Sequence, residues 1–235
     1  GNDLLMGGSG SDVLLGGDGD DDVKGGGGDD EMVGGDGAGN DTYEGGDGVD
    51  TVRYTSAITG ITVNLTTGVA DGKEIGHDVL VGIENIIGGK SDDVLTGDAG
   101  NNRIDGYTGD DLLEGAGGND TLVGGLGTDT AVFSGNREDY TIAFNTTTGE
   151  VTITDKVAGR DGTDVLVSME AIKFKNMSLP LNSGSVSLNG VATQGEELKV
   201  SVFDAKGING SISYQWLANG AAIVGATATS LTLGQ

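Results

Sequence analysis

A nine-residue repeat constrains what this 235-residue chain can fold into. Residues 7–15 read GGSGSDVLL and residues 16–24 read GGDGDDDVK, which are two copies of G-G-x-G-x-D-x-U-x, where U is a large apolar residue. The pattern runs through residues 1–53, with two additional residues in the copy at 34–44, and again through residues 88–133. A fixed period of this kind predicts a solenoid in which each repeat stacks on its neighbours.

Two positions of the repeat keep their chemistry in both blocks. The sixth position holds Asp3, Asp12, Asp21, Asp30, Asp41, Asp50, Asp93, Asn102, Asp111, Asp120 and Asp129. The eighth position holds Leu5, Leu14, Val23, Met32, Tyr43, Val52, Leu95, Ile104, Leu113, Leu122 and Ala131. Neighbouring side chains of a strand point to opposite faces, so we expect the eighth residue to point into the solenoid.

The glycines of the repeat predict a tight turn followed by a short strand. We expect positions one, two and four to adopt positive φ, which leaves room for only a three-residue strand at positions seven to nine. One repeat then buries one side chain. This burial does not offset the conformational entropy of nine residues, at about 1–2 kcal/mol each, so stacking and a further source of stability are required.

The charge balance indicates what that source is. Residues 1–53 hold 14 Asp or Glu and two Lys or Arg, and residues 88–133 hold nine and two. Stacked turns bring aspartates of successive coils together, and their ionisation is costly unless a cation lies between them. The chain has no Cys and one His, and carboxylate and carbonyl oxygens suit Ca²⁺. The sequence thus predicts calcium binding, and its negative charge argues against a nucleic-acid partner.

These repeats closely resemble the calcium-binding nonapeptide repeats of RTX proteins. The resemblance implies an all-β fold, a parallel β-roll with two repeats per coil and calcium between the turns of successive coils. It also implies that the position-six side chains are ligands, in seven candidate pairs: Asp3 with Asp21, Asp12 with Asp30, Asp21 with Asp41, Asp30 with Asp50, Asp93 with Asp111, Asn102 with Asp120, and Asp111 with Asp129. The further ligands implied are the turn carbonyls of Gly8, Gly10, Gly17, Gly19, Gly26, Gly28, Gly35, Gly46, Gly48, Gly89, Gly100, Gly109 and Gly118.

Three departures from the repeat bear on these sites. Asn102 brings a neutral ligand, so its site is expected to be weaker. Ser91 replaces a turn glycine and the copy at 34–44 is overlong, which leaves the geometry around Asp93 and Asp41 open. The competing interpretation is an acidic, glycine-rich disordered linker, which we expect to describe the chain without metal.

Three further segments interrupt or follow the repeats. Residues 54–87 predict strands that continue the solenoid between the blocks. Residues 134–179 look like a distant copy of that segment and are similar to the cap that closes RTX rolls. Residues 76–86 align with residues 162–172, which places Asp78 at the same position as Asp164 and Glu84 at the same position as Glu170. Residues 180–235 resemble the first strands of a bacterial immunoglobulin-like β-sandwich, with strands at 198–203 and 212–217 and Trp216 as a core residue.

The first coils carry an apolar outer face. Leu4, Met6, Val13 and Leu15 flank inward positions, whereas later coils carry charged residues there. Exposed apolar patches mark contacts, so this face either docks against a flanking domain or partner or is simply tolerated, and the two interpretations weigh equally.

The sequence predicts binding and folding rather than catalysis. The chain has no Cys and no second His that could act together with His77. The pairs of adjacent acidic residues, such as Asp110 and Asp111, lie in repeat register, so no catalytic site is expected. We expect no membrane span, and a chain that is an excerpt of a longer protein with flanking domains. The resemblance to RTX proteins implies type I secretion to the extracellular space or cell surface. A large adhesin is the expected parent, with a cell-surface or matrix partner. The alternative is the C-terminal module of a secreted protease, lipase, epimerase or peroxidase.

Overall fold

The computed structural model describes residues 1–181 except 35, 36, 38 and 146, and the backbone of five later strands. These later strands are β21 (Ser185–Asn189), β22 (Glu197–Phe203), β23 (Leu217–Ala218), β24 (Ala221–Ala222) and β25 (Ser230–Thr232). The chain divides into two compact units, Gly1–Leu179 and Pro180–Gln235. Each unit is described by itself.

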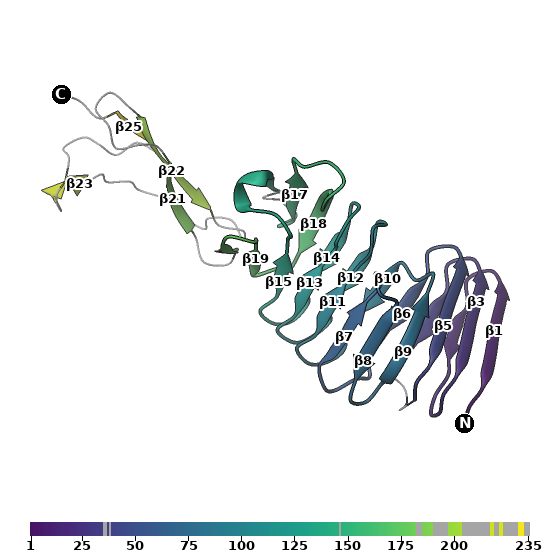
Figure 1. Cartoon of the computed structure of the whole chain (residues 1–235). Helices are drawn as coiled ribbons and strands as arrows, with labels where there is room; N and C mark the ends of the chain where they lie inside the picture. Colours follow the sequence, from purple (N-terminus) through teal and green to yellow (C-terminus); the bar gives the residue numbers. More distant parts are fainter. Residues whose placement is uncertain are drawn as a thin grey trace. The chain divides into compact units, whose positions relative to one another are not determined.

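The repeats of the first unit form a parallel β-roll of two facing sheets (Figure 1). One sheet contains β1 (Leu4–Ser9), β3 (Asp22–Gly27), β5 (Thr42–Asp47), β11 (Val94–Thr96), β13 (Leu112–Glu114) and β15 (Thr130–Val132). The other contains β2 (Val13–Leu15), β4 (Glu31–Val33), β6 (Thr51–Arg53), β12 (Arg103–Asp105) and β14 (Thr121–Val123). Consecutive repeats alternate between the sheets, so each coil contains two repeats, as predicted.

Register places the eighth-position residues beside one another. Leu5 pairs with Val23 and Val23 with Tyr43 along one sheet. The eighth-position residues from Val23 to Ala131 are 1% exposed or less, whereas Leu5 and Leu14 of the first coil are half-buried. Burying one large apolar side chain contributes about 1.5–3 kcal/mol, so this column is the core of the roll. The predicted inward position is confirmed.

Strand length differs from the prediction in part of the first block. The strands of the second block contain three residues, but β1, β3 and β5 contain six. Each of these longer strands continues through the first three residues of the following repeat, because those residues pair in register with the next coil: Gly8 with Gly26, and Gly26 with Gly46. A glycine-rich start of a repeat is therefore not always a turn.

The segment between the blocks inserts antiparallel strands into one sheet of the roll. It forms β7 (Ile61–Asn64), β8 (Val69–Gly72), β9 (Gly76–Val81) and β10 (Asn85–Ile87). One sheet runs β5-β9-β8-β7-β11, whereas the opposite sheet passes directly from β6 through β10 to β12. We call residues 54–87 the bridge, because parallel pairing resumes on both sheets after it.

The segment after the second block repeats the arrangement of the bridge in the other sheet. It contains the 3-10 helix η1 (Arg137–Asp139), then β16 (Tyr140–Phe144), β17 (Val151–Asp155), β18 (Thr163–Val167), β19 (Ala171–Lys173) and β20 (Ser178–Pro180). The order β16-β17-β18-β14 matches β7-β8-β9-β5, and β19 pairs in parallel with β15 as β10 does with β6. We call residues 134–179 the cap.

The second unit contains short antiparallel strands. Strands β21, β22 and β25 form one sheet, and β23 pairs with β24. The strand predicted at 198–203 lies within β22. Of the strand predicted at 212–217, Leu217 lies in β23, and residues 212–216, which include Trp216, lie outside the described residues. The immunoglobulin-like sandwich stays a prediction.

Candidate metal centre

The position-six residues form two ladders along the roll. The backbone N–H of each donates to Oδ1 of the aspartate one coil later, at N–O distances of 2.7 to 3.0 Å in all seven predicted pairs. Asp93 is the first position-six residue of the second block. Its Oδ1 accepts the backbone N–H of Ile61 at 2.9 Å, in place of the N–H of a position-six residue one coil earlier. The fold thus brings together every pair that the repeat predicts. Their role as metal ligands stays a prediction.

Four ladder residues lie outside the repeats and were missing from the predicted set. Asp78 and Glu84 of the bridge accept from the N–H groups of Asp41 and Asp50 at 3.0 and 2.8 Å. In the cap, Asp164 and Glu170 accept from Asp120 and Asp129 at 2.8 and 2.9 Å. The alignment of 76–86 with 162–172 places Asp78 with Asp164 and Glu84 with Glu170. This alignment is the sequence signal from which the four residues could have been predicted.

The second carboxylate oxygen of many ladder residues lacks a partner. No hydrogen-bond donor in the described part of the chain reaches the buried Oδ2 atoms of Asp12, Asp21, Asp30, Asp50, Asp111, Asp120 and Asp129. A buried acceptor left in this state costs about 1–3 kcal/mol, and more when it is charged. A cation that prefers oxygen ligands would satisfy such an atom by coordinating it.

The first glycine of most repeats faces these oxygens, which corrects the prediction for position one, whereas Gly34 faces the ring of Tyr54. Positive φ occurs at positions two and four, as at Gly8 and Gly10, both at 107°, but not at position one. A Cβ on Gly7 would instead lie 2.7 Å from Oδ2 of Asp12 and 2.6 Å from the carbonyl oxygen of Gly25 in the next coil. Glycine is required here because a carboxylate and a carbonyl oxygen converge beside it. Such a pair of hard donors fits Ca²⁺.

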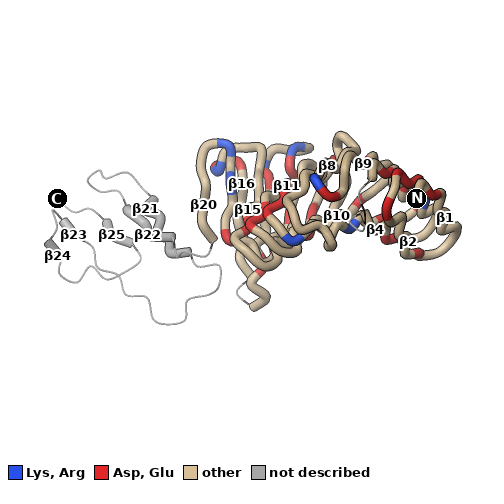
Figure 2. The backbone as a smooth tube through the Cα atoms, turned by 90° about the horizontal axis from the view of Figure 1, so that it is seen from below, with Lys and Arg blue, Asp and Glu red and all other residues tan. Residues whose placement is uncertain are grey.

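Burial raises the pKa of three ladder carboxylates in the second block. The pKa of Asp111 rises to about 7, and those of Asp120 and Asp129 to about 6, chiefly because burial disfavours their charged forms. Neighbouring carboxylates add to the effect. Figure 2 shows acidic residues in many successive coils with few Lys or Arg among them. The ladders therefore lack the positive charge that would stabilise them as carboxylates.

Comparison with known families agrees with this geometry. The family model described as RTX calcium-binding nonapeptide repeat matches four copies, at residues 1–32, 36–52, 80–113 and 97–131. The chain contains RTX repeats. No curated protein matches the chain. The RTX repeats support Ca²⁺ binding by a structural module, and such repeats are typical of secreted extracellular bacterial proteins.

Most predicted carbonyl ligands belong to glycines with the positive φ expected of the repeat, although Gly8, Gly26 and Gly46 lie within β1, β3 and β5 and not in turns. Positive φ is found at Gly8, Gly10, Gly17, Gly19, Gly26, Gly28, Gly46, Gly48, Gly109 and Gly118. Gly89 and Gly100 do not adopt it, and Gly35 lies outside the described residues. The carbonyl of Gly10 lies 2.8 Å from the point that a Cβ on Gly28 would occupy, so these carbonyls face the space between coils.

RTX turns beside the bridge differ, because protein donors satisfy their ladder oxygens. The Tyr43 hydroxyl donates to Oδ2 of Asp41 at 2.9 Å, and the Tyr54 hydroxyl donates to Oδ2 of Asp78 at 3.2 Å. The N–H of Gly89 donates to Oδ2 of Asp93 at 2.6 Å. These carboxylates therefore need a cation less than the aspartates elsewhere in the ladders.

Asn102 completes this group of internally satisfied turns. Its Oδ1 accepts from the N–H of Asp98 at 2.8 Å, and its Nδ2 donates to the carbonyl of Glu84 at 2.8 Å. Asp98 does not adopt positive φ, whereas Tyr107 and Ala116 do so at the same position of later RTX repeats, at 70° and 65°. The asparagine thus closes its turn with hydrogen bonds.

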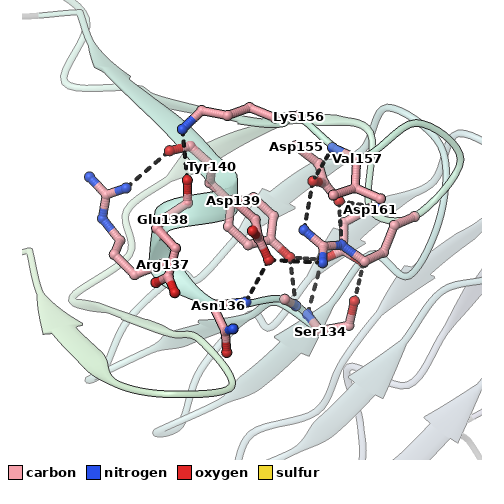
Figure 3. A network of polar contacts seen from close by, with 12 residues as sticks. Ser134, Asn136, Arg137, Glu138, Asp139, Tyr140, Asp155, Lys156, Val157 and Asp161 are labelled. Carbon is pink, nitrogen blue, oxygen red and sulfur yellow. Dashed lines mark hydrogen bonds and ion pairs between the residues drawn. The ribbon is translucent and has the colours of Figure 1, made fainter.

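The cap holds a polar network that is complete without a cation (Figure 3). Arg160 donates twice to Asp155, at 2.6 and 2.7 Å, and once to Asp139 at 3.1 Å. Asp161 accepts from the Tyr140 hydroxyl and from the N–H and hydroxyl of Ser134. Burial alone would raise the pKa of Asp155, but the hydrogen bonds from Arg160 lower it below its usual value. These carboxylates are part of a structural network.

The other group considered in the sequence, His77, lies in the bridge. Its Nδ1 is 2.7 Å from Oδ1 of Asp71, in an exposed contact between β9 and β8. Within the described residues, no three His, Asp or Glu side chains converge on one metal position. Candidate cation sites there must combine one or two carboxylates with backbone carbonyls. The same part of the chain has no helix with the length and hydropathy needed to cross a membrane.

Proposed function

We propose that the roll is a calcium-dependent folding module that orders when Ca²⁺ binds between the turns of successive coils. One observation supports this above all others: seven buried ladder oxygens have no donor within the described residues. The position-six carboxylates and the turn carbonyls would hold the ion, which supplies the missing positive charge. Asp12, Asp30 and Asp111 represent the ladder residues that take part.

Coupling between binding and folding follows from linkage. A ligand that binds only the folded state stabilises it by RT ln(1 + [L]/Kd) at each site. Each coil buries few apolar side chains against the entropy of a glycine-rich chain, so several such contributions are required. Low cytosolic calcium would keep the chain unfolded for type I secretion, and extracellular calcium would fold it on arrival.

The proposed parent is a large adhesin or surface protein. The resemblance of residues 180–235 to an immunoglobulin-like domain supports this assignment, because such domains recur in tandem in adhesins. A secreted exoenzyme is the alternative parent, and its catalytic residues would lie outside this chain.

Circular dichroism and metal counting test the proposal. We expect a strong β signal in millimolar calcium and a largely disordered spectrum in chelator. Asp111→Asn should reduce the bound calcium by about one ion per chain, because it removes a buried charged ligand. Asp110→Asn is the matched control, since this exposed neighbour accepts the N–H of Thr128 and an asparagine can do the same. Identical spectra in chelator and calcium would refute the proposal.

A further inference from the structure

Glu84 of the bridge and Glu170 of the cap hold equivalent places at the ends of the ladders. The N–H of Asp50 donates to Oε2 of Glu84 at 2.8 Å, and the N–H of Glu84 donates back to the carbonyl of Asp50 at 3.1 Å. Asp129 and Glu170 exchange the same two hydrogen bonds at 2.9 and 3.0 Å. A glutamate thus replaces the next ladder aspartate in two separate parts of the fold.

Each glutamate lies beside a ladder aspartate with an unsatisfied oxygen. Asp50 and Asp129 are both 0% exposed, and within the described residues no donor reaches either Oδ2 atom. Because these side chains are fully buried, bulk water does not replace the missing donor. The glutamates supply a second carboxylate to the same region.

A backbone carbonyl converges on each of these oxygens as it does between RTX turns. A Cβ on Gly45 would overlap both Oδ2 of Asp50 and the carbonyl oxygen of Gly82. A Cβ on Gly124 would overlap both Oδ2 of Asp129 and the carbonyl oxygen of Ser168. The bridge and the cap thus provide the carbonyl that the next repeat provides elsewhere.

The residues that supply these carbonyls share an unusual conformation. Gly82 has φ of 60° and Ser168 has φ of 51°. Ser168 adopts this left-handed conformation despite its Cβ, at a cost of roughly 1–2 kcal/mol. Strain of this kind persists where the surrounding structure requires it and is frequent at binding sites.

We propose that Glu84 and Glu170 each complete a calcium site at the end of a block of nonapeptides. One site combines the carboxylates of Asp50 and Glu84 with the carbonyl of Gly82. Its counterpart combines Asp129 and Glu170 with the carbonyl of Ser168. The inference rests on the proposed calcium-dependent function and extends it, because these two ions would tie each repeat block to the segment that follows it.

The other ladder of the bridge shows how a buried carboxylate oxygen is satisfied by a protein donor in place of a cation. Asp41 also meets a bridge carboxylate, Asp78, but the Tyr43 hydroxyl donates to Oδ2 of Asp41. A protein donor therefore replaces the cation there. Asp50 and Asp129 lack such a donor in the described structure, which distinguishes the glutamate sites.

Glu84→Gln and Glu170→Gln in the whole chain test the inference. Glutamine keeps an oxygen for the N–H of Asp50 or Asp129 but removes the charge. Calcium per chain is measured by equilibrium dialysis and elemental analysis at the lowest calcium concentration that saturates the wild-type protein. We expect each variant to bind about one ion fewer and the double variant about two fewer, because both sites depend on carboxylate charge.

Glu74→Gln is the matched control, since Glu74 lies in the bridge and its carboxylate also accepts a backbone N–H, that of Ile58. It should bind as much calcium as the wild type. Wild-type stoichiometry and affinity in both Glu84→Gln and Glu170→Gln would overturn the inference and leave the proposed function intact. A wild-type chain that binds no calcium would overturn the proposed function itself. If Glu84→Gln lacks the wild-type β signal in saturating calcium, Glu170→Gln decides the question.

Discussion

The turns of the roll and the polar network of the cap treat buried carboxylates in opposite ways. In the cap, Asp155 is matched by Arg160, and Asp161 by a tyrosine and a serine. In the roll, Asp111 and Asp129 are buried, yet no described donor reaches their Oδ2 atoms. The cap network therefore contains its own counter-charge and hydrogen-bond donors, whereas the described residues of the roll supply neither to these Oδ2 atoms.

Removal of calcium should separate the two regions most strongly. In chelator, we expect the amides of β3, β4, β13 and β14 to exchange hydrogen at rates near those of an unfolded chain. The amides of β16 and β17 should exchange about tenfold more slowly or better, because the cap network survives. Hydrogen exchange read by mass spectrometry, with and without calcium, measures both regions in one sample. Equal protection in the two regions would contradict the comparison.

Acidification should affect the two regions with opposite signs when calcium is removed. The folded pKa values of Asp111 and Asp129, about 7 and about 6, lie above the unfolded value of about 3.9. This contribution to stability is complete below the unfolded pKa and is lost as pH rises through 6 to 7. The pKa of Asp155 is lowered instead, so its contribution is lost as pH falls below about 4.

In calcium-free buffer, the roll should consequently show more β signal by circular dichroism at pH 5 than at pH 8. The amides of Val157 and Asp161, which donate to Asp155 in the cap network, should show no such gain by hydrogen exchange. A roll that becomes more ordered toward pH 8 without calcium would show that its carboxylates are not the destabilising groups.

The fold of the repeats could be predicted further than the fold of the bridge, for a physical reason. Stacking of identical units fixes both the inward column from Val23 to Ala131 and the pairing of Asp12 with Asp30. The bridge has no internal period, so nothing in its sequence specifies the order β9-β8-β7 between β5 and β11.

The candidate site shows the same limit. Asp30 and Asp50 follow from the repeat, but Glu84 lies 34 residues after Asp50, which is not a repeat spacing. Closure of the turn at Asp41 depends on a hydroxyl from Tyr43, which the pattern treats only as an apolar residue. The nine-residue period predicts which residues stack on one another. Which carboxylate oxygens remain without a hydrogen-bond donor depends on whether a nearby side chain is long enough to reach them.

Loss of one hydroxyl from the cap should have a moderate effect that calcium does not remove. Tyr140→Phe deletes the hydroxyl that donates to Asp161 and accepts from the N–H of Gly135. The buried N–H of Gly135 then lacks its acceptor, and Oδ2 of Asp161 loses one donor while it keeps the N–H of Ser134. We expect a loss of about 1–3 kcal/mol in urea unfolding at saturating calcium. Tyr107→Phe, at a side chain that is 41% exposed, is the control and should change stability by less than about 0.5 kcal/mol. A similar small change in Tyr140→Phe would show that the cap network is not needed.

Replacement of Asn102, whose side-chain hydrogen bonds close its turn, should have the smallest effect on calcium binding. Asn102→Asp replaces an Nδ2 donor that contacts the carbonyl of Glu84 with a charged oxygen. We expect about one additional calcium ion per chain by metal analysis, because the turn then has the ligands of its neighbours. Asn101→Asp adds the same charge at an exposed position of the same turn and should add no ion. Equal binding by the two variants would show that hydrogen-bond closure does not decide which turns take calcium.

The bridge enters and leaves the roll without shifting its alternation between sheets. Strand β6 lies in one sheet and β11 in the other, just as consecutive nonapeptides do. Splicing Arg53 directly to Gly88 would therefore join two repeats in frame. The first nonapeptide after the bridge lies in the sheet that it would occupy if the bridge were absent.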